Sequence, residues 1–334
     1  MRLLMMGTGP FAVPTFQRLV NSSHRVLGLI TRPIPIGKGT PPPNPMRIAA
    51  ESLGIPVYDP ASINSEQSQR LIQELSPDLF VVCDYGQILQ PAILQLAPLG
   101  GINLHGSLLP KFRGAAPIQR AMLAGVDVTG ISVIHMTPAL DAGPVLATRQ
   151  TPIGARETAP ELESRLSLLG VEAVMESIEL LAAHQSAHPP APPAPPAQHV
   201  PNAAFGSPQD PSLVSRAPRL QKSEGLVDWT RSAVEIDRQV RALKPWPNTY
   251  SFWERAGQSP LRLILERVAP TTTAASEPTP PGVIAAVTSN QVLVGTGQGL
   301  LALHAVQPAG KRVMEVAEFI RGYPMQPGQR FGNG

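Results

Sequence analysis

The chain has 334 residues, of which 43% are apolar and 15% are charged. This length and composition exclude a chain that is disordered throughout and predict two folded domains. The single cysteine, Cys83, excludes an internal disulfide framework and fits a reducing compartment. The sequence lacks an apolar run long enough to cross a membrane and any Cys/His cluster with zinc spacing. We therefore expect a cytoplasmic protein with no membrane contact and no metal.

The net charge of +3 is distributed unevenly along the chain. From Arg216 to Gly334 there are 14 Lys and Arg against 9 Asp and Glu, so this part is basic and the part before it is mildly acidic. A basic domain favours an anionic partner such as nucleic acid. A solvated surface with a chance excess of cations is the alternative.

The N-terminal stretch has the pattern strand, glycine turn, helix. Arg2–Met6 predicts a buried strand and Gly7–Pro10 a tight turn, and a helix follows from about Val13 because proline suits a first helical turn. A dinucleotide-binding turn needs a third glycine where Ala12 stands, and an acidic residue at the end of the second strand, Arg25–Ile30. Both are missing from the sequence, so we exclude NAD.

A proline-rich loop follows the second strand, from Thr31 to Pro45. Loops of about 15 residues are unusual inside a compact domain, and they are either functional or disordered. The centre of this loop carries Lys38 between two glycines, and Arg32 lies near its start. A lysine between glycines suits a contact with phosphate, and a mobile polyproline linker is the alternative.

Alternating helices and strands complete the first domain. Apolar periodicity predicts further helices over 45–53, 64–75, 91–96, 117–124 and 158–183, and strands over 55–58, 79–83, 101–105, 130–136 and 145–150. This alternation predicts an α/β fold with a parallel or mixed sheet.

The stretch Gly101–Pro110 ends a buried strand with two polar side chains. Because side chains alternate along a strand, Asn103 and His105 emerge on the same side, at the edge where open α/β sheets bind ligands. An amide and an imidazolium are both hydrogen-bond donors and suit an oxygen that gains negative charge. The N-x-H pattern alone is weak, and two polar groups satisfied within the protein explain it equally well.

A linker and a second domain follow the first 184 residues. Residues 185–215 are rich in proline and poor in aliphatic side chains, which predicts extended chain without a core of its own. In the third part, 216–334, five short strand-like runs over 249–306 are punctuated by glycine and proline. They predict a small β-barrel.

Three runs of residues resemble the folate-dependent formyltransferases: His105–Pro110, Arg113–Arg120 and Leu140–Gly143. In that family an Asn, a His and a downstream Asp form the catalytic set, and they correspond here to Asn103, His105 and Asp141. The family has Leu-Asp-Thr-Gly-Asp where this chain has Leu-Asp-Ala-Gly-Pro. We therefore expect the catalytic Asp to be kept and the shape of its loop to differ.

The resemblance also implies a fold and a set of ligand contacts. The fold is a Rossmann-like catalytic domain followed by an OB-like β-barrel domain. The proline-rich loop corresponds to a loop that inserts at the end of the tRNA acceptor stem, which implies tRNA contacts for Lys38 and Arg32. The implied folate-binding residues are Ser107, Leu108, Leu109, Pro110, Tyr85, Gly86 and Gln87.

The Arg113–Arg120 run is most similar to the family members that act on methionyl-initiator tRNA. The resemblance thus implies a monomer that transfers the formyl group of 10-formyltetrahydrofolate to the amino group of that tRNA for translation initiation. Enzymes that formylate glycinamide ribonucleotide or an amino sugar are the nearest alternatives, because they share the catalytic set. A non-catalytic tRNA-binding protein on the same fold would need no such set.

Overall fold

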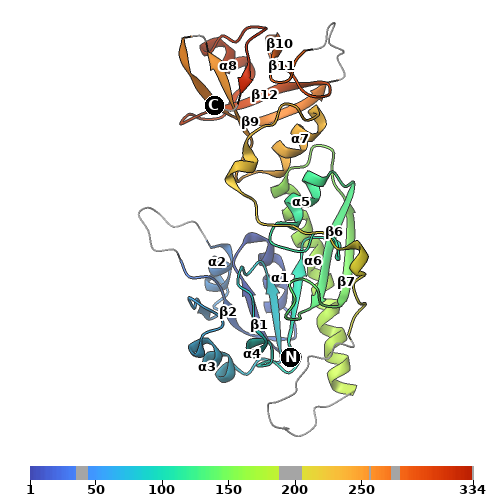
Figure 1. Ribbon diagram of the computed structural model, residues 1–334. Coiled ribbons are helices and arrows are strands. Elements are labelled where there is room, and N and C mark those ends of the chain that lie inside the picture. Colours follow the sequence, from blue (N-terminus) through green and yellow to red (C-terminus); the bar gives the residue numbers. More distant parts are fainter. Residues whose placement is uncertain (35–43, 188–204, 256, 272–278, 333–334) are drawn as a thin grey trace. The chain divides into compact units, whose positions relative to one another are not determined.

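A computed structural model describes residues 1–34, 44–187, 205–255, 257–271 and 279–332 (Figure 1). Two compact units make up the chain. The first comprises Met1–Pro117, Val128–Pro152 and Glu161–Pro218. The second comprises Ile118–Asp127, Ile153–Pro160 and Arg219–Gly334.

The first unit is built on a seven-stranded sheet with the strand order β3-β2-β1-β4-β5-β6-β7. The pairs from β3 to β5 are parallel, and β6 and β7 are added antiparallel. The predicted α/β fold with a mixed, mostly parallel sheet is therefore confirmed. The strands are β1 (Arg2–Gly7), β2 (Arg25–Ile30), β3 (Val57–Tyr58), β4 (Leu79–Cys83), β5 (Gly101–His105), β6 (Val128–His135) and β7 (Val145–Pro152).

The helices in the first 187 residues lie in the predicted ranges, and α4 is shorter than expected. Side-chain caps begin two of them: Asn44 accepts from the Arg47 amide at 3.0 Å, and Ser65 accepts from the Ser68 amide at 3.2 Å. The helices are α1 (Val13–Val20), α2 (Pro45–Ser52), α3 (Glu66–Leu75), α4 (Pro91–Leu94), α5 (Pro117–Ala124) and α6 (Ala159–Ala187).

The strands at the centre of this sheet are apolar because they are covered on both faces. Every residue of β4 is buried, and Leu3–Met6 of β1 are fully buried. The long helix α6 approaches β5 closely at Gly170, where an added Cβ would lie 2.6 Å from a methyl group of Leu104. This glycine lets the helix pack against the strand that carries Asn103 and His105.

The second unit contains a curled antiparallel sheet with the order β10-β11-β12-β9-β8-β14, and β13 pairs with β12. Its first and last strands meet, because Ile284 donates to the Gln329 carbonyl at 2.8 Å and Phe331 donates to that of Gly282 at 2.8 Å. The strands are β8 (Tyr250–Arg255), β9 (Gln258–Thr271), β10 (Ile284–Val287), β11 (Val292–Gly295), β12 (Leu300–Pro308), β13 (Met314–Glu315) and β14 (Phe331–Gly332).

This sheet encloses its own core, which also receives α7 (Ala233–Ala242) and α8 (Val316–Gly322). The core contains Trp229, Trp253, Phe319 and Phe331, all at most 5% exposed. The five predicted strands are present, and the barrel-like β domain is confirmed. The strands β13 and β14 were not predicted, since a run of two residues has no period to detect. The helix α8 was not predicted either, and its seven residues span only about two turns.

Candidate active site

Two polar side chains end strand β5, as the alternation predicted. Asn103 is half-buried, and His105 is only 6% exposed. They lie between β4 and β6, because Asn103 is in register with Val82 on one side and His105 with Ser132 on the other. The carboxamide of Asn103 forms no hydrogen bond with any residue that the structure describes, so it is available to a ligand.

The His105 ring is held between two acceptors. Its Nε2 lies 2.9 Å from the Phe112 carbonyl oxygen, and its Nδ1 lies 3.8 Å from Oδ2 of Asp141. A carbonyl oxygen can only accept, so Nε2 carries a hydrogen. The other ring nitrogen, Nδ1, faces the Asp141 carboxylate.

Asp141 is fixed by its loop and by a neighbouring amide. Its backbone is left-handed, with φ of 49°, a conformation that Asp tolerates better than most residues. The Gly114 amide donates to its Oδ2 at 2.8 Å. Gly143, two residues on, has no room for a side chain, because an added Cβ would lie 1.7 Å from the His135 carbonyl oxygen. The structure thus brings all three predicted catalytic residues into one site.

The turn after β5 is held by hydroxyl groups. Ser107 is fully buried and donates to the Lys111 carbonyl at 2.7 Å. The Ser132 hydroxyl donates to the Ser107 carbonyl at 2.8 Å and accepts from the Leu109 amide at 3.0 Å. Leu109 is buried, whereas Leu108 and Pro110 are half-buried. These bonds fix the shape of the predicted folate-binding turn.

In the second predicted folate-binding segment, Tyr85–Gln87, the Tyr85 and Gln87 side chains contact other parts of the protein. Tyr85 is 2% exposed in the core, where burial raises the pKa of its hydroxyl to about 12. The side-chain oxygen Oε1 of Gln87 accepts from the Ile63 amide at 2.9 Å. The exposed Arg32 side chain lies against Gly86, whose φ is 82°. A ligand at this segment would meet its backbone and Arg32. Lys38 lies outside the described residues.

Two acidic groups sit close to this segment. The Asp84 carboxylate lies against Gly9, where an added Cβ would be 1.7 Å from Asp84 Oδ2. Asp84 is partly open to water but otherwise surrounded by protein, and this desolvation raises its pKa to about 6. Burial, and then the charge of Asp84, raise the pKa of Glu163 on α6 to about 7. Burial raises the pKa of the Cys83 thiol well above its usual value, which leaves that thiol unreactive.

The structure adds residues that the sequence did not single out. Gln209, within the predicted linker, binds the loop that carries Asp141, and the Ser215 hydroxyl accepts from the Phe112 amide at 2.9 Å. Both residues stand in a proline-rich stretch whose composition suggested extended chain. No local pattern marks either residue, because their partners lie far away along the chain.

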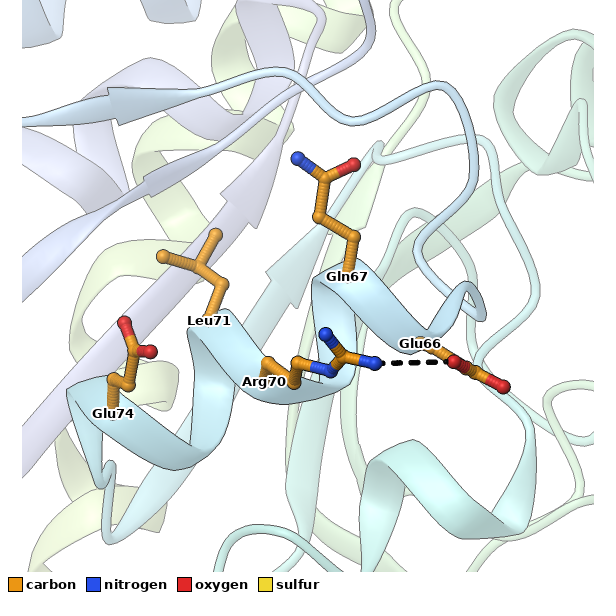
Figure 2. A pocket seen from close by; sticks show the side chains of 5 residues that line it. All are labelled: Glu66, Gln67, Arg70, Leu71 and Glu74. Carbon is orange, nitrogen blue, oxygen red and sulfur yellow. Dashed lines mark hydrogen bonds and ion pairs between the residues drawn. The ribbon is translucent and has the colours of Figure 1, made fainter.

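One further hollow on the described surface is formed by a single helix. A shallow hollow on α3 is lined by one helix alone, and its Arg70 and Glu66 form an exposed ion pair at 3.3 Å (Figure 2). Among the described residues, no helix is long and apolar enough to cross a membrane. In that same part of the chain, no group of three or more His, Cys, Asp or Glu could hold a metal ion.

Comparisons with known proteins agree with this arrangement. The family model "Formyl transferase" matches residues 1–178, and "Formyl transferase, C-terminal domain" matches residues 219–324. The fold and the site thus define a formyl transferase. The sugar 3N-formyl transferase WlaRD, crystallised in the presence of dTDP and 5-N-formyl-THF, has the same fold, with a TM-score of 0.63, 14% identity and coverage of 93% of this chain and 99% of that one.

More similar relatives identify the branch of this family to which the chain belongs. It is 46% identical to the methionyl-tRNA formyltransferase of Rhodopirellula baltica, over 99% of this chain and 96% of the relative. It is 37% identical to that of Geobacter sulfurreducens, over 99% and 97%. The chain belongs to the methionyl-tRNA formyltransferases, and the resemblance seen in its motifs is confirmed.

Proposed function

We propose that this protein transfers the formyl group of 10-formyltetrahydrofolate to the α-amino group of methionyl-initiator tRNA, and that Asn103, His105 and Asp141 carry the reaction. The observation that carries the proposal is the convergence of these three side chains at the end of β5, with His105 Nδ1 3.8 Å from Asp141 Oδ2. Membership of the family supports the reaction class and the tRNA substrate.

The reaction is acyl transfer between two nitrogens. The neutral amine attacks the formyl carbon, a C–N bond forms, and the carbonyl oxygen becomes an oxyanion. Collapse restores the carbonyl and breaks the bond to N10 of the folate, which takes up a proton. The amine gives up its proton to Asp141, directly or through water. No covalent intermediate on the protein is required.

Asn103 and His105 stabilise the oxyanion in different ways under this proposal. Both ring nitrogens of His105 face protein acceptors, so its contribution to the oxyanion is the positive charge of the imidazolium. The carboxamide of Asn103 is the direct hydrogen-bond donor. Asp141 stabilises the imidazolium and is placed to accept the proton of the amine.

The remaining ligand contacts follow the same proposal. The turn Ser107–Pro110 and the backbone of Tyr85–Gln87 bind the folate, and both lie at the carboxyl edge of the sheet. Lys38 and Arg32 contact the acceptor end of the tRNA. Lys38→Ala should therefore raise the KM for the charged tRNA and reduce its salt dependence by about one phosphate contact, without changing folate affinity.

A substrate comparison tests the proposed function. The full-length protein is supplied with 10-formyltetrahydrofolate and, in parallel, with methionyl-initiator tRNA, methionyl-elongator tRNA, glycinamide ribonucleotide and a nucleotide-linked amino sugar. We expect formylation of the initiator tRNA at a kcat/KM far above the others. Preferred formylation of either small amine would overturn the tRNA assignment, and binding of tRNA without any formyl transfer would identify a non-catalytic protein.

A further inference from the structure

Gln209 uses its whole carboxamide to join two loops of the site. Its Nε2 donates to the Asp141 carbonyl at 2.8 Å and to the Gly143 carbonyl at 2.7 Å. Its Oε1 accepts from Nε and Nη2 of Arg113 at 3.0 and 2.7 Å. Reversing the amide would set its oxygen against two carbonyls and its nitrogen against a guanidinium, so the chemistry of the partners fixes its orientation.

The segment that carries Gln209 is itself pinned at both ends. We call Phe205–Ala217 the strap. Ser207 exchanges two backbone hydrogen bonds of 2.8 Å with Val145 at the start of β7. Arg113 donates to the Ser215 carbonyl at 2.9 Å and accepts from the Ala217 amide at 2.7 Å. Gln209 therefore approaches the Asp141 loop from a backbone fixed on both sides, which limits the entropy lost in ordering its side chain.

The two carbonyls that Gln209 binds belong to the strained part of the Asp141 loop. Asp141 is in the left-handed region, with φ of 49°, which a residue other than glycine adopts only with some strain. Such a conformation persists only where its surroundings over-determine it. The Gly114 amide holds the Asp141 carboxylate, and the Gln209 amide holds its backbone.

We propose that Gln209 is a positioning residue for Asp141: it locks the left-handed Asp141 backbone and so sets the carboxylate against His105. This inference rests on the proposed function, because it assumes that Asp141 takes part in formyl transfer. A misplacement of about 1 Å in a catalytic group lowers turnover by up to about a hundredfold. Gln209 touches neither reacting group, so its loss should alter kcat and leave the binding of both substrates nearly unchanged.

Two variants of similar size distinguish positioning of Asp141 from a role in which Gln209 only ties the strap to Arg113. Gln209→Glu keeps an acceptor for Arg113 but replaces the two N–H donors by an acceptor, whereas Gln209→Met removes every hydrogen bond. Both should lower kcat by about 10- to 100-fold, and the KM values for the folate donor and for methionyl-initiator tRNA should stay within about threefold of wild type. A residue that merely tied the strap to Arg113 would be rescued by Gln209→Glu, so wild-type turnover in that variant would overturn the proposal.

A neighbour on the strap is the matched control. Asp210 is exposed, and among the described residues its carboxylate bonds only to the amide and hydroxyl of Ser212. Asp210→Asn should keep kcat within about twofold of wild type, since it disturbs the strap without touching the Asp141 loop. Circular dichroism and thermal unfolding of each variant, with active sites counted by single turnover, correct kcat for any unfolded fraction. A corrected kcat equal to wild type in both Gln209 variants would also overturn the proposal.

A double-variant cycle separates this inference from the proposed function. If Gln209 acts through Asp141, then adding Gln209→Met to Asp141→Asn should change kcat by less than about twofold. Independent, multiplicative losses would overturn the positioning role and leave Asp141 in the mechanism. If Asp141→Asn itself had wild-type turnover, the proposed mechanism would fail whatever the Gln209 variants did.

Discussion

Different forces stabilise the β domain of the second unit and the proposed catalytic edge of the first. By catalytic edge we mean the end of β5, the turn Ser107–Pro110 and the loop that carries Asp141. In the β domain, neighbouring strands are fixed by burial of apolar side chains, and Val292, Val294, Leu301 and Leu303 are at most 1% exposed. At the end of β5, the loops are fixed by a few hydrogen bonds to Ser132, Gly114 and Gln209. Burial depends on volume, whereas a hydrogen bond depends on the position of one atom.

This difference predicts two kinds of sensitivity to substitution. Apolar cores accept another apolar side chain of similar volume and lose stability in proportion to the space left empty. Loops held by polar contacts lose their geometry when one donor disappears, even where the volume is conserved. Substitutions of apolar core residues in the β domain should therefore act on stability, and substitutions of the three proposed catalytic side chains should act mainly on turnover.

The largest effect is expected in the β domain, at Phe319. It is 1% exposed, stacks on Tyr323 with ring centroids 4.7 Å apart and packs edge-on against Trp253. Phe319→Ala should lower the free energy of unfolding by about 3–5 kcal/mol, and Phe319→Leu by only about 1.5 kcal/mol. Denaturant unfolding measures both. Equal losses in the two variants would show that volume is not what this position supplies.

At the catalytic edge, Asn103→Ala, His105→Ala and Asp141→Ala should each lower kcat by at least about a hundredfold, the usual loss for an oxyanion donor or acid–base group. Their melting temperatures should stay within a few degrees of wild type, because these side chains border the site rather than fill the core. Single-turnover formylation and thermal unfolding measure the two quantities.

The isosteric Asp141→Asn sharpens this test. Asn can still accept from the Gly114 amide but carries no charge to face His105. Turnover should fall nearly as far as in Asp141→Ala. Near-normal turnover in Asp141→Asn would mean that the residue serves only to cap its loop.

The two regions also differ in how much of them the sequence predicts. Buried strands such as Leu79–Cys83 are visible as apolar runs, and Asn103 and His105 follow from the period of two along β5. Asp141 was predicted because the run Leu140–Gly143 resembles a formyltransferase motif. In each case the signal lies within a few neighbouring residues.

The remaining parts of the site depend on contacts between distant segments. Gln209 bonds to Asp141, 68 residues away, and Ser215 bonds to Phe112, 103 residues away. Tyr85 and Gln87 matched a motif, but only the packed structure reveals that their side chains are used internally.

A smaller effect than the loss of a catalytic group is expected at Ser132. It is fully buried and serves two backbone groups of the turn after β5. Ser132→Ala leaves both unpaired and should lower the free energy of unfolding by about 1–3 kcal/mol. The control is Ser177→Ala in α6, where the hydroxyl only adds a bond to the Ala173 carbonyl. If the two variants lost the same stability, the turn would not depend on Ser132.

The smallest effect tests electrostatics at the carboxyl edge of the sheet, where burial, and then the charge of Asp84, raise the pKa of Glu163. The folded-state pKa of Glu163 is about 7, above the 4.5 expected when unfolded, so the folded protein binds more protons between these values. Stability should therefore fall as the pH rises through this range and stay low above about 7. The half-exposed position of Glu163 limits this penalty to about 1 kcal/mol at pH 8.

Glu163→Gln removes the charge while keeping the size of the side chain. It should raise the free energy of unfolding at pH 8 by about 1 kcal/mol and change it little at pH 4.5, where the wild-type carboxyl is already protonated in the folded protein. Asp84→Asn should act in the same direction and also lower the pKa of Glu163, because it removes the neighbouring charge. Urea unfolding at the two pH values, for wild type and both variants, gives the comparison. A gain that is the same at pH 4.5 and pH 8 would assign the effect to packing rather than to charge.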